Sequence, residues 1–302
     1  MRTQRRGKAL SALLLIALVA LGLTASAQAK LTGEFTKFAN CPYTNPTAIK
    51  CIYSVTNSGE VVLGSKKVPI VNPVTLQGAY GTPVEEKEEA EFYPFIAATN
   101  GVTLSKTPQP VPGGLAGIVN CKEIKEFLLR ISCEVTFENG VTGLNSTLEL
   151  AKPASAIRIS ENNLAGEIGT ALQMPIKIHL ENPFLGSECY VGSSSSPIIW
   201  NLTSGTTNPP PPNTPISGSG GEGEFLEGFK ILKLKNNVLV DNAWAAPGVR
   251  GCGGFLVELL LNPIVNSNAG LPAAAGRNTA ILKNTLYEAS AFTVNKVNNE
   301  NP

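Results

Sequence analysis

Short stretches in which apolar and polar residues alternate recur along this chain. Residues 131–138 read Ile-Ser-Cys-Glu-Val-Thr-Phe-Glu and lead into Asn139-Gly140, a pair typical of hairpin turns. Residues 176–181 alternate in the same way. Because successive side chains of a strand point to opposite faces, both segments are predicted to be strands with one face against a core. In the first strand, the side chains expected to be buried are those of Ile131, Cys133, Val135 and Phe137, while Glu134, Thr136 and Glu138 face outward.

Further strands follow from the same pattern. Residues 232–240 read as two strands around Asn236-Asn237, which indicates a second hairpin. Other candidates, separated by Gly, Asn and Pro, are residues 51–56, 60–63, 74–77, 156–160, 198–203 and 280–292. Many short alternating strands with frequent turns are typical of antiparallel sheets. The predicted fold class is therefore mainly β, an antiparallel β-sandwich braced by disulfides, with one or two short helices.

Two segments are candidates for those helices. Residues 255–261 are apolar nearly all round, begin after Gly253-Gly254 and end at Asn262-Pro263. Such a helix is most often part of a core, and the alternative is a face that binds a partner or a lipid surface. Residues 122–129 are the second candidate, for one or two helical turns.

One segment breaks the strand pattern. Residues 206–215 contain four consecutive prolines, and residues 217–224 are rich in Gly and Ser. We expect an exposed, mobile loop over residues 206–224, which a protease cleaves first, after Glu222 or Glu224. No domain boundary is placed there, because a disulfide between Cys189 and Cys252 would reach across the loop.

The N terminus has the pattern of a secretory signal peptide. Four basic residues among the first eight are followed by apolar residues 9–24, and Ala27 and Ala29 are small residues just ahead of the expected cleavage site. The apolar run is shorter than the roughly 20 residues of a usual membrane span. Residues 1–29 are therefore predicted to be removed, which leaves a secreted β-rich domain of residues 30–302 in the cell envelope or the extracellular space, with no stable membrane anchor.

An exported protein with an even number of cysteines is expected to form disulfides. The six cysteines all follow the signal segment: Cys41, Cys51, Cys121, Cys133, Cys189 and Cys252. Six cysteines permit fifteen connectivities. Spacing favours neighbours, which gives the pairs Cys41–Cys51, Cys121–Cys133 and Cys189–Cys252. A Cys-x-x-Cys pair, the usual sign of a structural metal site, does not occur in the sequence.

Composition removes several classes of function. The chain has one histidine, His179, and one aspartate, Asp241, so neither a multi-histidine zinc site nor an Asp-rich calcium loop can be assembled, and no cofactor is predicted. Without residues 1–29 the chain carries 20 Lys and Arg against 23 Asp and Glu, a net charge near −3. Nucleic acid and anionic membrane surfaces require basic patches, and the sequence shows none.

Catalytic arrangements are hard to build from these residues. A Ser-His-Asp triad needs both His179 and Asp241, yet His179 lies on the polar face of its predicted strand and no Gly-x-Ser-x-Gly motif occurs. Nucleophilic cysteine is excluded if all six thiols are paired. The chain is therefore predicted not to be an enzyme.

Paired glutamates are the remaining catalytic option, as in a glycosidase. On a strand, Glu134 and Glu138 would lie roughly 13 Å apart, which is too far. Glu222 and Glu224 lie in the predicted loop, which cannot hold a fixed geometry. A run of glutamates is typical of solvated surface, and this one consists of Glu85, Glu86, Glu88, Glu89 and Glu91.

Three stretches of the chain resemble a known group of proteins. They are residues 120–133, residues 178–212, which begin Ile-His-Leu-Glu-Asn-Pro-Phe, and residues 251–278, which begin Gly-Cys-Gly-Gly-Phe. In these stretches the chain is similar to uncharacterised secreted proteins found in actinobacteria. The resemblance includes cysteine positions and implies export, but it brings neither an activity nor a functional residue.

Taken together, these patterns predict a secreted, non-catalytic binding or structural protein with an unknown envelope or extracellular partner. One alternative is a carrier of an apolar ligand in a cavity between sheets, with residues 111–115 and 255–261 at its mouth. A lesser alternative is a glycosidase that uses paired glutamates.

Overall fold

The computed structural model describes residues 31–82, 85–87, 90–139 and 141–300. The predicted signal segment, residues 1–29, and the side chains of the glutamate run from Glu85 to Glu91 lie outside the described residues.

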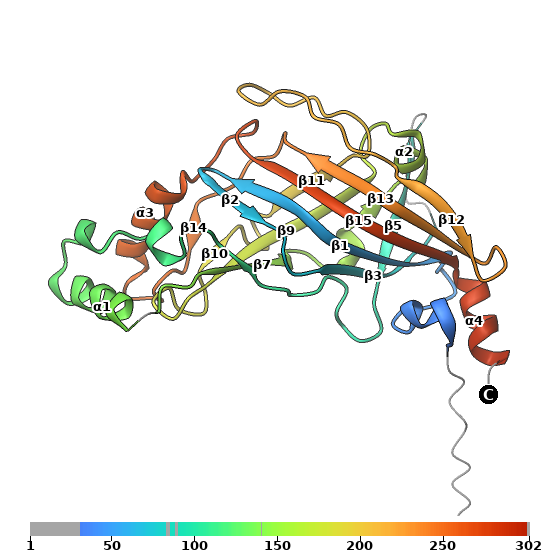
Figure 1. Cartoon of the computed structure of the whole chain (residues 1–302), viewed down its shortest axis with the longest axis horizontal. Helices are drawn as coiled ribbons and strands as arrows, with labels where there is room; N and C mark the ends of the chain where they lie inside the picture. Colours follow the sequence, from blue (N-terminus) through green and yellow to red (C-terminus); the bar gives the residue numbers. More distant parts are fainter. Residues whose placement is uncertain (1–30, 83–84, 88–89, 140, 301–302) are drawn as a thin grey trace, which may run out of the picture.

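Strands make up most of the secondary structure, and the short helices lie mainly at the two ends of the elongated molecule (Figure 1). The strands are β1 (Lys50–Leu63), β2 (Lys66–Pro69), β3 (Val74–Tyr80), β4 (Glu85–Lys87), β5 (Ala90–Ala97), β6 (Gln109–Pro110), β7 (Asn145–Leu150), β8 (Arg158–Ile159), β9 (Leu172–Glu181), β10 (Tyr190–Val191), β11 (Ile198–Leu202), β12 (Glu222–Leu226), β13 (Ile231–Asp241), β14 (Val249–Arg250) and β15 (Thr279–Ser290). The helices are α1 (Phe127–Glu138), α2 (Glu161–Gly166), α3 (Glu258–Ala269) and α4 (Ala291–Glu300), and the 3-10 turns are η1 (Gly33–Phe38), η2 (Leu115–Gly117), η3 (Cys121–Glu123) and η4 (Ala154–Ala156).

All pairs between these strands are antiparallel, and they join into one continuous sheet. One layer has the strand order β12-β13-β15-β1-β3-β5. The short β8 connects β5 to β9, and β9 carries β7 along one edge and β11 and β10 along the other. The predicted fold class is confirmed: the protein is mainly β and antiparallel, with few helices and with disulfides.

The two layers also meet at a second place. Thr203, directly after β11, exchanges two backbone hydrogen bonds with Val240 of β13, with N–O distances of 2.9 and 2.8 Å. Since β11 pairs with β9, and β13 belongs to the other layer, this contact closes the sheet on itself around one interior. Inward side chains of both layers form the main core.

The alternation predicted for β9 is confirmed. Ile176, Ile178 and Leu180 are buried, while Lys177, His179 and Glu181 lie on the opposite, partly exposed face. β11 alternates in the same way and places Ile198, Trp200 and Leu202 inward with no exposed surface. Strands with one buried face give this pattern because the side-chain period is two.

The hairpin predicted at Asn236-Asn237 is wrong. Residues 231–241 form the single strand β13, and its pairing with β15 shifts register between Leu234 and Asn237. Asn236 adopts a φ of 54°, a left-handed conformation that Asn tolerates better than most residues. The Asn-Asn pair therefore forms a bulge, in which one extra residue is taken up without reversing the chain.

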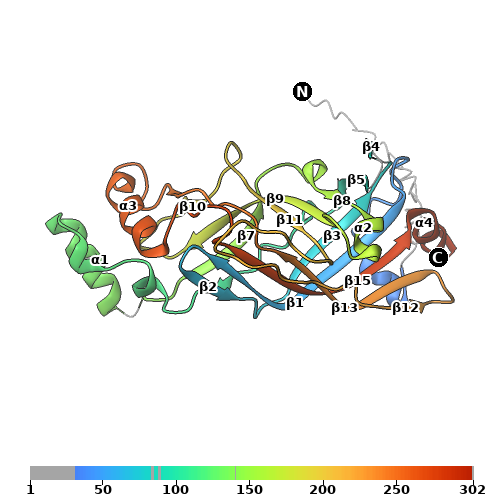
Figure 2. The same ribbon diagram turned by 90° about the horizontal axis from the view of Figure 1, so that it is seen from above.

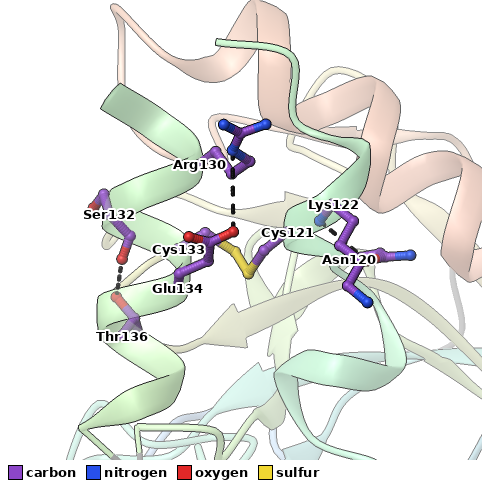
Figure 3. The surroundings of a disulfide bond; sticks show 8 residues. All are labelled: Asn120, Cys121, Lys122, Arg130, Ser132, Cys133, Glu134 and Thr136. Carbon is purple, nitrogen blue, oxygen red and sulfur yellow. Dashed lines mark hydrogen bonds and ion pairs between the residues drawn. A yellow bond between two sulfur atoms is a disulfide. The ribbon is translucent and has the colours of Figure 1, made fainter. Parts of the chain in front are cut away.

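The strand predicted over residues 131–138 is also wrong, because these residues belong to helix α1. Ile131 and Val135 are 39% and 45% exposed instead of buried, Phe137 is half-buried, and only Cys133 is buried. A spacing of two also places Cys133 and Phe137 four residues apart, which puts them on one helix face. Contacts at the same spacing support the helix: Arg130 lies 4.0 Å from Glu134, and the Thr136 hydroxyl donates to the Ser132 carbonyl at 2.8 Å (Figure 3).

The predicted helix over residues 255–261 is displaced toward the C terminus. Helix α3 begins at Glu258, continues through Pro263 and ends at Ala269, and Gly270 follows it as a left-handed C-cap. Its buried stripe is Leu261, Val265 and Ala269, at a spacing of four residues. The expectation of a core helix is wrong for Phe255, Leu256 and Leu259, which are more than 80% exposed. Of the second candidate, residues 122–129, only short pieces in η3 and α1 are helical.

The proline- and glycine-rich segment is more regular than predicted. Its proline part is exposed, but Thr206 and Ser217 form a bridge, and Ser219 pairs with Val238 of β13. Glu222 and Glu224 lie in strand β12, paired with β13, and not in a loop. Cleavage after either glutamate would therefore require this pairing to open.

All six cysteines are paired, as neighbours in the sequence: Cys41–Cys51, Cys121–Cys133 and Cys189–Cys252. The second disulfide joins η3 to the middle of α1 (Figure 3). Cys133 is the one fully buried side chain of this 12-residue helix, and Leu129 and Phe137 pack against the core only half-buried, so packing holds α1 weakly. An isolated helix of this length is marginal in water, so the disulfide is the main restraint on α1.

A first prediction concerns this restraint. The double variant Cys121→Ser/Cys133→Ser should release α1, because no other buried side chain of the helix holds it. Trypsin should then cut after Arg130 much faster than in the parent, while the thermal midpoint of the β core changes little. Cys189→Ser/Cys252→Ser is the matched control: it opens a 63-residue separation in the core and should cost roughly 4 kcal/mol of global stability. Equal resistance of parent and first variant at Arg130 would contradict the weak packing of α1.

Candidate functional site

Three cavities lie between the two layers of the sheet. The first, the helix-end cavity, has a volume of about 50 Å³ and is lined by Leu63, Val68, Val111, Leu180 and Ala269 among others. The second, the middle cavity, has about 40 Å³ and is lined by Thr56, Met174, Trp200 and Leu282 among others. The third, the acid-end cavity, has about 50 Å³ and is lined by Ile52, Tyr80, Ile159, Glu161 and Glu288 among others.

The cavities form a row, because neighbours share walls. Ile70, Val74 and Leu148 line both the helix-end and the middle cavity. Four residues line both the middle and the acid-end cavity: Ser54, Leu76, Leu172 and Leu239. Neighbouring cavities therefore have common walls, and the row follows the interior from the α3 end toward α2.

The walls are mostly aliphatic. Packed protein interiors contain few voids larger than a water molecule, because every void forfeits dispersion contacts. Each cavity here has room for more than one water, at roughly 10–15 Å³ for one, yet water needs polar partners that aliphatic walls do not offer. Apolar cavities such as the helix-end cavity, in which only Lys66, Gln109 and Ser146 are polar, stay dry and accept apolar molecules. The acid-end cavity also has polar walls. The row is therefore a candidate binding site for an apolar ligand.

Trp200 lies in the wall of the middle cavity, fully buried, with its ring centre 6.0 Å from that of Trp244. The Trp244 indole donates to the Asp241 carbonyl at 3.2 Å. The Trp200 indole N–H, by contrast, has no hydrogen-bond partner among the described residues. Buried donors are nearly always paired. The Trp200 N–H is therefore an exception, a donor inside the core without a partner among the described residues.

The acid-end cavity ends in a polar cluster of four side chains, Lys50, Tyr80, Glu161 and Glu288. The Tyr80 hydroxyl is within hydrogen-bond distance of both carboxylates. Lys50 Nζ lies 2.5 Å from Glu161 Oε2 and 3.0 Å from Glu288 Oε1. Register creates the cluster: Lys50 of β1 pairs with Tyr80 of β3, and Glu288 lies on the other neighbouring strand, β15. Glu161 is the first residue of α2, which follows β8.

The protonation of the cluster follows from burial and proximity. Burial first, and then the charge of Glu161, raise the pKa of Glu288 above its usual range. Burial and the Glu288 charge raise the pKa of Tyr80, which stays a phenol. Burial lowers the pKa of Lys50, but the charge of Glu288 and the hydrogen bond to Glu161 outweigh it, and the net direction is upward. A phenol has one hydrogen, so it donates to one carboxylate, and a proton held by the other completes the pair of hydrogen bonds.

This pair of glutamates, Glu161 and Glu288, is the one that the sequence could not reveal. Glycosidases hold two carboxyl groups on either side of a bound sugar, about 5–9.5 Å apart. Here Lys50 and Tyr80 contact both carboxylates and fill the space between them. The glutamates considered from the sequence lie elsewhere: Glu134 is exposed on α1, and Glu224 of β12 forms an ion pair with Lys235 of β13.

His179 and Asp241 are not brought together with a nucleophile. The His179 ring stacks on Tyr190 at 4.4 Å, and its Nδ1 lies 3.5 Å from Glu181 and 3.9 Å from Glu149. The Asp241 carboxylate is buried and accepts backbone N–H bonds from Asn201 at 2.7 Å and Ala243 at 2.9 Å. Asp241 thus supports the turn after β13, and its pKa is raised by burial.

Of the residues predicted at a cavity mouth, Val111 lines the helix-end cavity. Residues 255–261 do not line it: Val257 and Leu261 lie in a separate groove of about 360 Å³ between α3 and α1. Among the described residues, no helix is both long enough and apolar enough to cross a bilayer. Comparison with family models, with curated proteins and with solved structures gave no match for this chain.

A second prediction tests the protonation of the cluster. The native state binds the Glu288 proton more tightly than the unfolded chain, so ionisation of Glu288 costs stability. The free energy of unfolding should fall as the pH rises above 4.5, the ordinary value for glutamate, toward the raised native pKa. Urea unfolding of Glu288→Gln, followed over about pH 4 to 8, should show a smaller fall than the parent.

The matched variant is Tyr80→Phe, which should act in the opposite direction. The hydrogen bond from Tyr80 lowers the pKa of Glu288, so its removal should raise that pKa further and enlarge the fall. Parent-like pH profiles for both variants would show that the cluster does not hold a shared proton.

Proposed function

We propose that the protein is a secreted, non-catalytic carrier of apolar molecules, which holds an apolar chain between the two layers of its sheet. The observation that carries the proposal is the row of three cavities with shared aliphatic walls. Rotamer changes of a few wall residues, such as Val74, Leu148 and Leu76, would join the cavities into one channel. An extended chain needs a channel of this kind, whereas a compact ligand would need one wide pocket.

Export is supported by the disulfides and by the N-terminal sequence. Disulfides persist mainly in oxidising compartments, and all six cysteines of this chain are paired. Residues 1–29 have the pattern of a cleaved signal segment, with the cut expected after Ala29. Apolar molecules outside the cytoplasm require a carrier because water dissolves them poorly.

The polar cluster favours one kind of ligand head group. It contains the Lys50 ammonium, whose pKa is raised, and two carboxyl groups, of which Glu288 holds its proton more tightly than usual. An additional carboxylate or phosphate would find no free cation there, because Lys50 already contacts Glu161 and Glu288, while a hydroxyl or amine would find acceptors. The proposed ligand is therefore a long apolar chain with a neutral or cationic hydrogen-bonding head.

A third prediction uses Trp200 as a reporter of chain binding. A brominated long-chain alcohol, delivered from cyclodextrin without membranes, should quench tryptophan fluorescence, because Trp200 lines the middle cavity. In Trp244→Phe, Trp200 is the only tryptophan left, so the quenching should become nearly complete. Val74→Phe should block quenching, because Val74 lines both the helix-end and the middle cavity.

The matched control is Val71→Phe, three residues away, on a side chain that is 54% exposed. It adds the same ring outside the core and should leave quenching unchanged. Overpacking typically costs about 1–3 kcal/mol, so the fold of Val74→Phe is checked by its thermal midpoint, and Leu148→Phe serves as a second blocked variant. A parent protein that shows no quenching, with no lipid in its solvent extract, would exclude the carrier.

A fourth prediction concerns the head group. At neutral pH, a brominated alcohol or amine should bind at least about tenfold more tightly than the carboxylic acid of equal chain length, because a carboxylate would be buried beside the cluster without a free cation. Glu288→Gln removes one of the two carboxyl partners of Lys50, which leaves this ammonium more available to the acid and should narrow the difference. Tighter binding of the acid in the parent would contradict the proposed preference of the cluster for a neutral or cationic head group.

A further inference from the structure

The end of the molecule formed by α1 and α3 presents large apolar side chains to solvent. Both views place the two helices together at this end, opposite α4 (Figures 1 and 2). Phe127 and Leu128, at the start of α1, are 63% and 80% exposed. Phe255, Leu256 and Leu259, around the start of α3, are 88%, 85% and 81% exposed. Exposed apolar residues gathered in this way indicate an interaction surface.

The geometry points to a lipid bilayer as the partner: we propose that these five side chains, the apolar tips, insert into the surface of a membrane. They project from two separate helix starts. A side chain that is 80% or more exposed has no wall beside it, whereas a protein partner would have to supply a fitted pocket for each tip. The fluid interface of a bilayer takes up separate projecting side chains without such a fit.

The charges around the tips select the kind of membrane. Basic side chains near α1 and α3 are Lys122, Lys125, Arg130 and Arg250, and acidic ones are Glu123, Glu126, Glu134, Glu138 and Glu258. Anionic lipids are bound through an excess of basic residues, which this end lacks. The expected partner is therefore a zwitterionic or neutral bilayer, and the attraction should be nearly independent of salt.

The tips are connected to the interior by the buried face of α3. At one end of this face, Leu261 lines the groove of about 360 Å³ between α1 and α3. Two turns further on, Ala269 lines the helix-end cavity. The buried stripe Leu261, Val265 and Ala269 thus runs from the membrane-facing groove to the first cavity. The role of this end as the entrance for an apolar chain rests on the proposed function, whereas bilayer docking rests on the exposed tips alone.

The test is flotation of the exported protein with phosphatidylcholine vesicles, after its mass has shown that residues 1–29 are absent. The parent should float with the vesicles, at low and at high salt. Phe255→Ser/Leu256→Ser should lower the partition coefficient roughly tenfold for each side chain removed, as should Phe127→Ser/Leu128→Ser. These residues are exposed, so the thermal midpoint should not change.

The matched control is Phe292→Ser in α4, at the opposite end, where the side chain is 76% exposed. It should float like the parent. Absence of the parent from the vesicle fraction, or equal flotation of parent and Phe255→Ser/Leu256→Ser, would overturn the docking surface. A dimer in sedimentation that the same double variant dissolves, without vesicle binding, would overturn it in favour of self-association.

The two proposals fail separately. Quenching of Trp200 by a chain delivered from cyclodextrin needs no membrane and tests the interior alone. Quenching without flotation would leave a carrier whose docking surface has been refuted. Flotation without quenching would leave a membrane-bound protein whose carrier function has been refuted.

Discussion

The closure of the sheet on itself is the constraint on which the rest of the structure depends. In an open sandwich the two layers can approach until their side chains fill the space between them. Here β8 joins the layers on one side, and the backbone hydrogen bonds between Thr203 and Val240 join them on the other. The width of the interior is therefore set by backbone pairing. Where the inward side chains are too small for that width, voids remain that collapse cannot remove without breaking hydrogen bonds.

Helices α1 and α3 lie at one end of this closed sheet and add few side chains to its core (Figure 1). α1 buries one side chain, Cys133, and depends on its bond to Cys121. α3 packs one narrow stripe on the body and leaves Phe255, Leu256 and Leu259 outside. The Cys121–Cys133 disulfide thus holds α1 in a position that hydrophobic packing alone would stabilise only weakly. This is the reverse of the usual order, in which packing positions a helix and a disulfide reinforces it.

The sequence predicted the features that depend on local pattern. Residues 176–181 of β9 alternate strictly because one face of the strand is buried, and Cys41–Cys51 and Cys121–Cys133 pair because short loops bring them together. It failed where two structures share one pattern. The alternation of residues 131–138 is typical of a strand, but the segment lies at the end of the molecule. It forms a helix there, stabilised by contacts between residues four apart (Figure 3). Asn236-Asn237 suits a turn, but the pairing of β13 with β15 continues across it as a bulge.

The polar cluster could not be predicted because its members come from four distant places in the chain. Lys50 and Tyr80 become neighbours through the register of β1 with β3, and Glu288 joins them through the register of β1 with β15. A slip of one residue in either pairing would turn one of these side chains to the other face of the sheet. Glu161 arrives by the short connection from β8 to α2. In the sequence, each of these residues looks like an ordinary polar residue on the surface, and only the long-range pairing of strands brings them together as a cluster.

The two ends of the interior differ chemically, and this difference gives the proposed carrier a direction. At one end, Lys50, Tyr80, Glu161 and Glu288 satisfy one another and can exchange hydrogen bonds with a polar head. At the other end, the cavity wall continues through Ala269 and Leu261 toward exposed apolar tips, which offer no partner for such a head. A chain with one polar end is therefore more stable in one orientation, with its head at the cluster and its tail toward α3. Entry from a bilayer at the α3 end would require the head to pass the aliphatic cavities first, which is cheap for a hydroxyl and costly for a charge. The interior thus favours a neutral head group on the way in, whereas the cluster itself accepts either a neutral or a cationic one.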